Sequence, residues 1–503
     1  MSLGEHLRQI SEIDSTATAV YFGDRTYSWG DLRRGADATI EALDRAGVPA
    51  GAPVGWIARN HPSIAAAALG ILMSGRCVSP LNPLQPSARL ADQVAALRMP
   101  AIVGMAEDWA DTVVAGARQA GSVGIVVDID GPAPARLLDG LGRLGEGPFY
   151  AVPPGVVLER NSSGTTGEPK RIPVTEAVVE TSMGLANRSS KASSQPARLA
   201  LKSSAGVHIG PFGHASGIFH LVMWLYEGRP FVLFDKFDAR AWAAAVERFK
   251  IRTGSLVPSM LNMVLEADPP ASQLASLICV RSGTAPLDAS AKAEFERRYQ
   301  IPVLTEYGAS EFMGGVAAWT LDDHREWSAT KSGAAGRLRP DVEARITDAT
   351  TGKDLAFGQV GILRLKCDRW GPDWIATTDL ASLDEDRFVY IHGRADEAII
   401  RGGFKILPEK VAEVLRRHPG VRDASVLAIK DARLGQAPLA IIERMPGGAP
   451  TPKALEALVR EHLPAYNVPV AFEIVEELPR TPSLKVARPA VRERFAGKYE
   501  FVV

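Results

Sequence analysis

Short apolar runs alternate with helix-like stretches rich in alanine and leucine through the first half of this 503-residue chain. Residues 53–58 are strand-like, residues 62–74 form a helix-like run with small residues throughout, and residues 76–80 return to a strand-like pattern. A strand, a helix and a second strand in this order are typical of a βαβ unit. The alternation therefore predicts layered α/β structure.

The pattern changes to an alternation of period two around residues 341–368. Val342, Ala344 and Ile346 alternate with polar residues, and Leu363 and Leu365 alternate with charged ones. Such alternation is typical of half-buried strands, so we expect antiparallel hairpins or a small β-barrel here. A further strand at residues 387–391 leads into a charged segment at residues 393–397, where we place a domain boundary.

The segment after this boundary has the composition of a separate small domain. Pro408 begins a helix-like stretch, residues 426–429 are strand-like, and residues 452–463 form a second amphipathic helix. We therefore predict an N-terminal domain at 1–394 and a C-terminal α+β domain at 395–503, of about a hundred residues. The length of the chain agrees with this division, because one hydrophobic core seldom supports so many residues.

Charge and cysteine content exclude several classes of partner. The formal net charge is -1, which leaves no excess of positive charge for nucleic acid or an anionic membrane, so we expect a small-molecule partner. The first ten residues lack an apolar signal segment, and the most apolar stretches, 64–73 and 217–226, are shorter than the roughly 20 residues that span a bilayer. Three widely separated cysteines predict neither disulfides nor a metal site, and they favour a cytoplasmic protein without a stable membrane anchor.

The strongest local signal is the segment 161–170, which follows a strand-like stretch at 155–158. It contains four hydroxyl side chains, two glycines and one lysine in ten residues. Backbone N–H groups, hydroxyls and an ammonium suit a polyphosphate, so the predicted phosphate contacts are Ser162, Ser163, Gly164, Thr165, Thr166, Gly167 and Lys170. The segment is not a Walker A loop, because Glu168 and Pro169 separate the second glycine from the lysine. A flexible connector would have a similar composition.

Seven further segments follow in order, and with them most of the chain resembles the adenylate-forming superfamily of acyl-CoA synthetases, adenylation domains and luciferases. After the phosphate loop, the matching segments are 211–217 (PxFHxxG), 282–287 (SGGAPL), 307–311 (YGxTE), 377–379 (TGD), 393–397 (GRxDD), 401–408 (GGxxIxP) and 478–486 (LPRTxxGK). The resemblance implies an N-terminal domain of layered α/β subdomains plus a small β-barrel, joined by a hinge to a mobile α+β C-terminal domain. It also implies ATP, Mg²⁺ and coenzyme A as ligands.

The resemblance assigns nucleotide-binding roles to the matching residues. Asp379 would accept hydrogen bonds from the ribose hydroxyls, and Arg394 would donate to ribose or phosphate. Tyr307 would present its ring to adenine. Glu311 would be the carboxylate ligand of Mg²⁺. The rest of the implied nucleotide site comprises Gly283, Thr284, Ala285, Pro286, Glu306, Gly308 and Ser310.

The two half-reactions would use different parts of the C-terminal domain. Lys485 would neutralise charge that builds on the transferring phosphoryl oxygens when a carboxylate attacks the α-phosphorus. The domain would then swing about the hinge residue Asp396 and bring the Gly402–Gly403 turn to the site, where a pantetheine arm could pass close to the backbone. His214 resembles the residue that gates the thiol channel.

Several residues depart from the family motifs. Leu484 replaces the glycine before the terminal lysine, Thr378 and Glu397 replace a glycine and an aspartate, and Lys410 stands where a glutamate is usual. The segment 366–377 is also shortened. Leu484 and the shortened segment keep open an acceptor other than CoA, either an amine or a carrier-protein thiol. A non-catalytic nucleotide-binding scaffold is the alternative outside the enzyme class.

The carboxylic acid itself is not specified by the sequence. Phe219, Phe312 and Met313 predict an apolar acyl or aryl group. A homodimer would be ordinary for such a chain.

Overall fold

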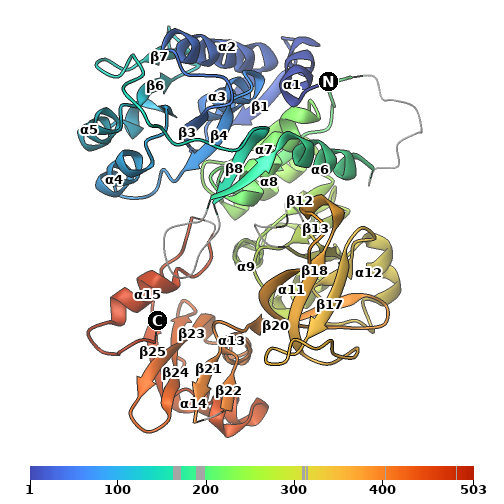
Figure 1. The fold of residues 1–503 in the computed structure, drawn as a ribbon. Helices are drawn as coiled ribbons and strands as arrows, with labels where there is room; N and C mark the ends of the chain where they lie inside the picture. Colours follow the sequence, from blue (N-terminus) through green and yellow to red (C-terminus); the bar gives the residue numbers. More distant parts are fainter. Residues whose placement is uncertain are drawn as a thin grey trace. The chain divides into compact units, whose positions relative to one another are not determined.

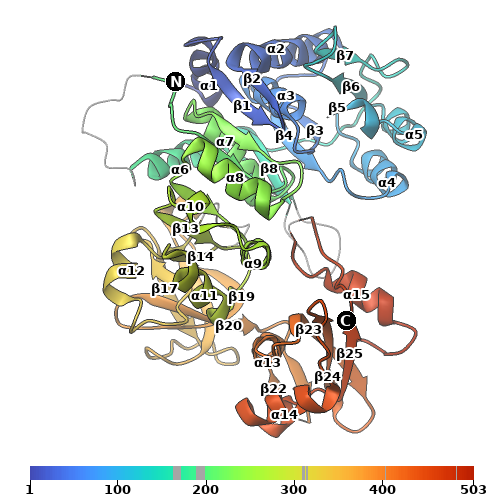
Figure 2. The ribbon, with the colours of Figure 1, turned by 180° about the vertical axis from the view of Figure 1, so that it is seen from behind.

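The computed structural model describes residues 1–161, 171–188, 199–308, 312, 315–402, 404–482 and 484–502. The described chain forms two compact units, the first within 1–255 and 267–278 and the second within 256–266 and 279–503. Figures 1 and 2 show both from opposite sides. The predicted mixed α/β fold, with a larger N-terminal part and a smaller α+β C-terminal part, is confirmed. The boundary at 394/395 stays a prediction.

A seven-stranded sheet forms the centre of the first unit, in the order β7-β6-β5-β3-β4-β8-β9. The predicted βαβ unit is present, because β3 (Pro53–Ile57) and β4 (Cys77–Leu81) pair in parallel and α3 (Pro62–Met73) connects them. The other strands are β5 (Ala101–Gly104), β6 (Val123–Val127), β7 (Ala135–Leu137), β8 (Val156–Asn161) and β9 (Arg171–Thr175). Only β7 and β9 pair antiparallel to their neighbours.

Helices cover both faces of this sheet, as Figure 1 shows. On one face α2 (Trp29–Arg45) packs against α3 so closely that a Cβ at Gly70 would lie 2.5 Å from the Ala36 carbonyl oxygen. On the other face α4 (Ser87–Leu97) and α5 (Asp111–Ala120) share an apolar core with Ile57, Leu81 and Ile102. Burial on both faces explains why β3, β5 and β6 are apolar throughout.

A second, four-stranded sheet of the first unit has the order β10-β11-β1-β2. Its strands are β10 (Gly206–His208), β11 (Phe231–Leu233), β1 (Thr18–Phe22) and β2 (Arg25–Ser28). The remaining elements of this unit are α1 (Leu3–Glu12), η1 (Ala106–Asp108), α6 (Glu176–Arg188), α7 (Ala215–Tyr226), α8 (Ala239–Phe249), β12 (Thr253–Ser255) and α10 (Ala271–Leu274). The apolar stretch 217–226 thus belongs to α7.

In the second unit, strands follow the order β13-β14-β15-β16-β20-β19-β18-β17. The first two strands are parallel and the others are antiparallel, which includes the predicted hairpin of β17 and β18. The elements are α9 (Pro258–Ala267), β13 (Cys279–Ser282), α11 (Ala289–Tyr299), β14 (Val303–Tyr307), β15 (Ala317–Ala318), α12 (Leu321–Trp327), β16 (Gly336–Leu338), β17 (Glu343–Thr347), β18 (Gly361–Lys366), η3 (Asp368–Trp370), β19 (Ile375–Leu383) and β20 (Phe388–Arg394).

The C-terminal part of the second unit is built on a separate sheet, β22-β21-β24-β23, with β25 parallel to β24. Helices α13 and α14 share one apolar core with this sheet, and α15 shares another. The elements are β21 (Ile399–Arg401), β22 (Phe404–Ile406), α13 (Pro408–Arg416), β23 (Val421–Asp431), β24 (Gly435–Arg444), α14 (Pro452–His462), η4 (Ala465–Asn467), β25 (Ala471–Val475) and α15 (Arg488–Phe495). This matches the predicted α+β composition.

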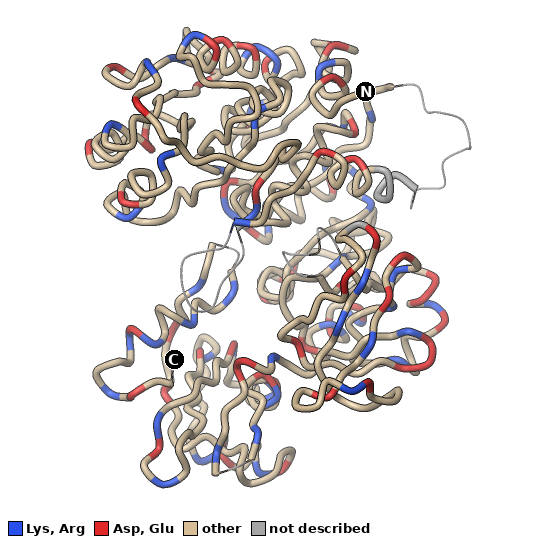
Figure 3. Tube along the Cα trace, in the orientation of Figure 1, with Lys and Arg blue, Asp and Glu red and all other residues tan. Residues whose placement is uncertain are grey.

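Residues of both charges are interspersed along the chain, as the coloured Cα trace of Figure 3 shows. This distribution agrees with the net charge of -1. Across the described residues, every helix is too short or too polar to cross a lipid bilayer.

Candidate functional site

The predicted phosphate loop connects β8 to β9, and its residues 162–170 lie outside the described residues, as do Ser310, Glu311 and Gly403. The two strands that flank the loop are described. They pair antiparallel, and Asn161 faces Arg171 at the last register position before the loop. The strand expected at residues 155–158 is therefore confirmed and extends to the loop itself.

A buried carboxylate, Glu159, lies near the base of this hairpin and is 1% exposed. It accepts hydrogen bonds from Ser79 Oγ and Tyr150 Oη, both at 2.6 Å, and pairs with Arg171 Nη1 at 3.3 Å. Burial, together with the hydrogen bond to this carboxylate, raises the pKa of Tyr150 to about 12. A buried carboxylate is costly unless it is paired and fully hydrogen-bonded. The cluster therefore fixes both strands of the hairpin to β4.

Three of the predicted nucleotide-binding residues of the second unit, Asp379, Arg394 and Tyr307, lie together. Asp379 on β19 faces Arg394 on β20 in the strand register. The hydroxyl of Tyr307, at the end of β14, donates a short hydrogen bond to Asp379 Oδ2. One Asp379 oxygen is therefore shared with a phenol, and the carboxylate can accept additional hydrogen bonds, as a ribose contact requires.

The turn at 283–286, which the resemblance assigns to the nucleotide site, follows the carboxyl end of β13, and β13 is adjacent and parallel to β14. Thr284 has φ of 70°, the left-handed conformation that glycine usually supplies. A Cβ on Gly283 would lie 2.7 Å from Glu306 Cγ, so this turn packs directly against β14. Ala285 and Pro286 continue the turn, and Gly308 directly follows Tyr307. Ligands of α/β proteins characteristically bind at the carboxyl ends of parallel strands.

The predicted hinge residue Asp396 forms a bidentate ion pair with Arg394, at 3.1 Å from Nε and 2.8 Å from Nη2. Ala395 N–H also donates to the Thr378 carbonyl at 2.8 Å. The hinge segment thus contacts the same arginine that is predicted to contact the nucleotide. Glu397, which replaces the family aspartate, pairs with Arg488 at the start of α15.

The hairpin that carries Lys485 has a strained turn. Leu484 N–H donates to the Thr481 carbonyl at 2.8 Å, and Thr481 N–H donates to the Lys485 carbonyl at 2.7 Å. Leu484 itself has φ of 60°, the left-handed position that glycine occupies in hairpins of this type. Burial of the ammonium lowers the pKa of Lys485 below its usual range.

Gly402 forms the turn between β21 and β22 with φ of 56°. Its N–H donates to the Leu434 carbonyl at 2.9 Å, and a Cβ here would lie 3.0 Å from Leu434 Cδ2. Any larger residue would therefore be strained and would extend over Leu434. A glycine with left-handed φ is the usual residue at such a hairpin turn.

His214 belongs to the first unit, at the N-cap of α7. Its N–H donates to the Pro211 carbonyl at 2.9 Å, and a Cβ on Gly217 would lie only 1.9 Å from that oxygen. Sequence reasoning missed Asn60, whose side chain accepts from Phe212 N–H and donates to the Gly210 carbonyl. The feature of the sequence that could have revealed Asn60 is its position as a polar residue shortly after a buried parallel strand.

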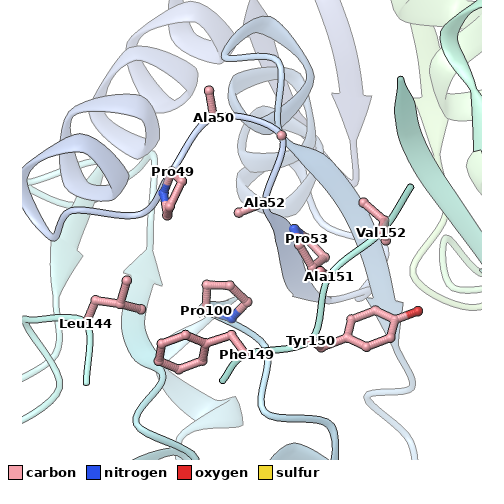
Figure 4. A pocket seen from close by; sticks show the side chains of 11 residues that line it. Pro49, Ala50, Ala52, Pro53, Pro100, Leu144, Phe149, Tyr150, Ala151 and Val152 are labelled. Atoms are coloured by element: carbon pink, nitrogen blue, oxygen red, sulfur yellow. The ribbon is translucent and has the colours of Figure 1, made fainter. Parts of the chain in front are cut away.

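The first unit also contains a pocket of about 290 Å³, which Tyr150 of the Glu159 cluster helps to line. It is formed where the chain enters β3 and β5, near the amino ends of the strands, and its lining residues are mostly apolar (Figure 4): Pro49, Ala50, Gly51, Ala52, Pro53, Pro100, Leu144, Phe149, Tyr150, Ala151 and Val152. Ligands of such sheets usually bind at the opposite, carboxyl ends. We do not assign this pocket to the predicted reaction.

The predicted magnesium site depends on Glu311 alone. Within the described part of the chain, no three or more His, Cys, Asp or Glu side chains are grouped so that they could hold a metal ion. Mg²⁺ usually needs only one or two protein carboxylates, with waters and substrate phosphates completing its shell.

Comparison with known proteins gives matches over nearly the whole chain. The chain is 28% identical over 455 residues to 4-coumarate--CoA ligase-like 6 of Oryza sativa subsp. japonica, covering 83% of this chain and 73% of that one. ATP-bound MatB from Rhodopseudomonas palustris has the same fold, with a TM-score of 0.81, 22% identity and coverage of 98% and 99%. The amide bond synthetase McbA from Marinactinospora thermotolerans has a TM-score of 0.77 and 25% identity, with coverage of 98% and 100%.

Two family models match the chain in the order that its motifs predict. The model described as the AMP-binding enzyme C-terminal domain matches residues 410–485. The model described as AMP-binding enzyme matches residues 8–368, which is well over half of the chain, and the protein therefore belongs to the AMP-binding enzyme family.

Proposed function

We propose that this enzyme couples a carboxylic acid to coenzyme A in two steps. In the first, a carboxylate oxygen attacks the α-phosphorus of ATP, the bond to the β-phosphate oxygen breaks, and acyl-adenylate and pyrophosphate form. In the second, the CoA thiol, having lost its proton, attacks the acyl carbon, and AMP leaves as the thioester forms. The nucleophile of the first step is already an anion, so the step needs no general base.

The contact set of Asp379 is the observation that carries this proposal. This carboxylate lies opposite Arg394 and accepts from Tyr307, and the hinge residue Asp396 contacts the same Arg394. An acceptor for ribose hydroxyls, a cation for phosphate and an aromatic ring for adenine are thus grouped next to the proposed hinge. These are the groups that recognition of a nucleotide requires.

Charge neutralisation would come from both parts of the chain. Lys485 would stabilise the transferring phosphoryl oxygens in the first step, because an ammonium that is positioned in advance lowers the barrier without reorganisation. The hydroxyls, glycines and Lys170 of the loop at 162–170, with Ser310, would hold the other phosphates. Mg²⁺, with Glu311 as its expected protein ligand, would supply further charge neutralisation when bound.

The second step would use the Gly402–Gly403 turn after the C-terminal domain, 395–503, rotates about Asp396. His214 would line the path of the thiol. The left-handed φ of Gly402 and its contact with Leu434 support a narrow backbone passage at this turn. The hinge ion pair between Arg394 and Asp396 would rearrange during this motion.

An amine acceptor is the second candidate for the final step. The similarity to an amide bond synthetase at 25% identity over 98% of this chain favours it. So do Leu484 and the shortened segment 366–377, which depart from the motifs of acyl-CoA synthetases. A carrier-protein thiol is a third possible acceptor, and a non-catalytic nucleotide-binding scaffold is the alternative if no acid is activated.

The acid would be apolar, either acyl or aryl. Phe312 is fully buried and packs against Trp370 with ring centroids 4.7 Å apart, which supports an apolar environment close to Tyr307. All three cysteines are described, buried and outside any disulfide, which supports a reducing, cytoplasmic setting. A homodimer stays a prediction that light scattering would test.

The decisive experiment measures products from a panel of carboxylic acids incubated with the enzyme, ATP and Mg²⁺. We expect acid-dependent release of AMP and pyrophosphate, with a thioester when CoA is present. AMP release without a thioester, and with an amide when amines are supplied, would replace CoA by an amine. ADP as the nucleotide product, or no acid-dependent pyrophosphate exchange with any acid, would reject the proposal.

A further inference from the structure

Arg480 joins two carboxylates of the C-terminal sheet to the hairpin that carries Lys485. Its Nη2 lies 2.7 Å from Glu443 Oε2 and 3.1 Å from Asp423 Oδ2. Its Nη1 donates to the main-chain carbonyl of Leu484 at 3.2 Å. The arginine therefore contacts the residue directly before the proposed catalytic lysine.

The two carboxylates are held in place by other groups. Asp423 on β23 faces Glu443 on β24 in the strand register, where like charges repel unless a cation lies between them. Glu443 is 1% exposed, and it also accepts from Leu478 N–H and pairs with Arg422. Asp423 pairs with Arg416, and although burial alone would raise its pKa, Arg416 and Arg480 hold that pKa low. Arg480 is thus anchored to a fixed acceptor pair.

The hairpin needs such an anchor because its turn is disfavoured. Leu484 is left-handed, with φ of 60°, a conformation that L-residues other than glycine, asparagine and aspartate rarely adopt. The hydrogen bond from Arg480 fixes the carbonyl of the peptide between Leu484 and Lys485. It therefore fixes the direction in which the lysine leaves the turn. A strained turn persists only where its surroundings determine it.

We propose that Arg480 is a positioning residue for Lys485, which holds the strained Leu484 turn so that the ammonium is directed for the adenylation step. The inference rests on the proposed function, since it assigns Lys485 to the first half-reaction only. It predicts that weakening Arg480 impairs adenylation and spares acyl transfer. A purely structural arginine would impair both steps to the extent that it destabilises the domain.

Arg416 provides the matched control. It is half-buried, shares Asp423 with Arg480 and pairs with Glu409 at 2.7 Å, and within the described residues it contacts these carboxylates and the Ala424 carbonyl, outside the hairpin. Arg480→Lys and Arg416→Lys keep the charge and lose the forked geometry that lets arginine reach several acceptors. Both variants should fold, and thermal unfolding would measure how far each destabilises the domain.

The test compares pyrophosphate exchange with transfer from supplied acyl-adenylate to CoA. We expect Arg480→Lys to slow pyrophosphate exchange at least tenfold and to change the rate of acyl transfer less than twofold. Arg416→Lys should leave the ratio of these two rates within twofold of wild type. Adding Leu484→Gly to Arg480→Lys should restore exchange at least threefold, because glycine removes the strain that the arginine opposes. Equal losses in both steps for Arg480→Lys, or no rescue by glycine, would overturn the inference. Wild-type protein without any exchange would instead reject the proposed function.

Discussion

Thr284 and Leu484 are left-handed residues that stand where the resembled motifs have glycine. At both positions the backbone has the left-handed conformation typical of glycine, although the residue carries a side chain that makes this conformation strained. A left-handed non-glycine residue costs roughly 1–2 kcal/mol, and glycine costs about 0.5–1 kcal/mol more chain entropy on folding. The first cost is the larger, so the strain should be measurable.

Replacing Thr284 with glycine should therefore raise the free energy of unfolding by up to about 1 kcal/mol. Urea unfolding, followed through the transition of the second unit, would measure this. Thr350→Gly is the matched control, because Thr350 is exposed and does not have a positive φ. That control should lose about 0.5–1 kcal/mol. Equal destabilisation by both substitutions would show that the Thr284 turn is not strained.

Lys485 should set an alkaline limit on adenylation. Its pKa is lowered by burial from the usual 10.5, and only the charged form can neutralise phosphoryl oxygens. The adenylation rate should therefore be at its maximum at pH values below the pKa of Lys485 in the folded protein. It should fall as the pH rises through that pKa, which lies below the ordinary lysine range. The kcat/KM for pyrophosphate exchange, measured against pH, reports this limb for the free enzyme.

Two substitutions of Lys485 check that assignment. Lys485→Arg should move the alkaline limb upward, because arginine stays charged throughout the accessible range. Lys485→Ala should reduce exchange by orders of magnitude and leave transfer from supplied acyl-adenylate largely intact. An unchanged alkaline limb in the arginine variant, or equal loss of both steps in the alanine variant, would mean that the role of Lys485 is wrongly assigned.

At the level of elements, local patterns predicted the secondary structure well. The βαβ unit at 53–80, the hairpin of β17 and β18 and the helix that begins at Pro408 follow from apolar periodicity and helix-start signals, which are local in the sequence. The Glu159 cluster could not be predicted in this way, because Ser79 and Glu159 are 80 positions apart. The roles of Asn60 and Arg480 could not be predicted from local patterns either, because each residue acts through partners that only the tertiary fold brings near.

The Glu159 cluster should fix the hairpin of β8 and β9, and through this hairpin the position of the phosphate loop. Tyr150→Phe removes a 2.6 Å hydrogen bond to Glu159, and loss of a bond to a charged group costs about 1.5–3 kcal/mol. We expect a lower unfolding midpoint and a KM for ATP raised severalfold, with the KM for the acid nearly unchanged. Steady-state kinetics with each substrate varied in turn would measure both constants.

Tyr499→Phe is the control for that prediction. It removes a comparable hydrogen bond, from Tyr499 to Glu473 at 2.5 Å, in the C-terminal part of the chain. Its KM for ATP should stay at the wild-type value. If both variants changed this KM alike, the effect would reflect general destabilisation and not the position of the phosphate loop.

At the scale of the whole molecule, one small domain is proposed to serve two reactions with two different turns. The Lys485 hairpin lies between β25 and α15, the Gly402 turn lies between β21 and β22, and each carries a left-handed residue. The resemblance supplied this division of labour, and no local pattern would have revealed it. Separating the two half-reactions would test the proposed rotation about Asp396.

Gly402→Leu should separate them. The new side chain would meet Leu434 and project where the pantetheine arm is proposed to pass. We therefore expect the rate of thioester formation to fall at least 100-fold, a loss of about 2.7 kcal/mol of transition-state stabilisation. The rate of pyrophosphate exchange should stay within about threefold of wild type. Gly447→Leu imposes similar left-handed strain in the same C-terminal part, with nothing within 4 Å of the added Cβ. Because strain alone would affect both variants, a selective loss in Gly402→Leu identifies the turn as part of the thiol path. If both variants slowed thioester formation equally, Gly402 would not be part of the thiol path. The structural reason for the C-terminal domain to rotate would then be lost as well.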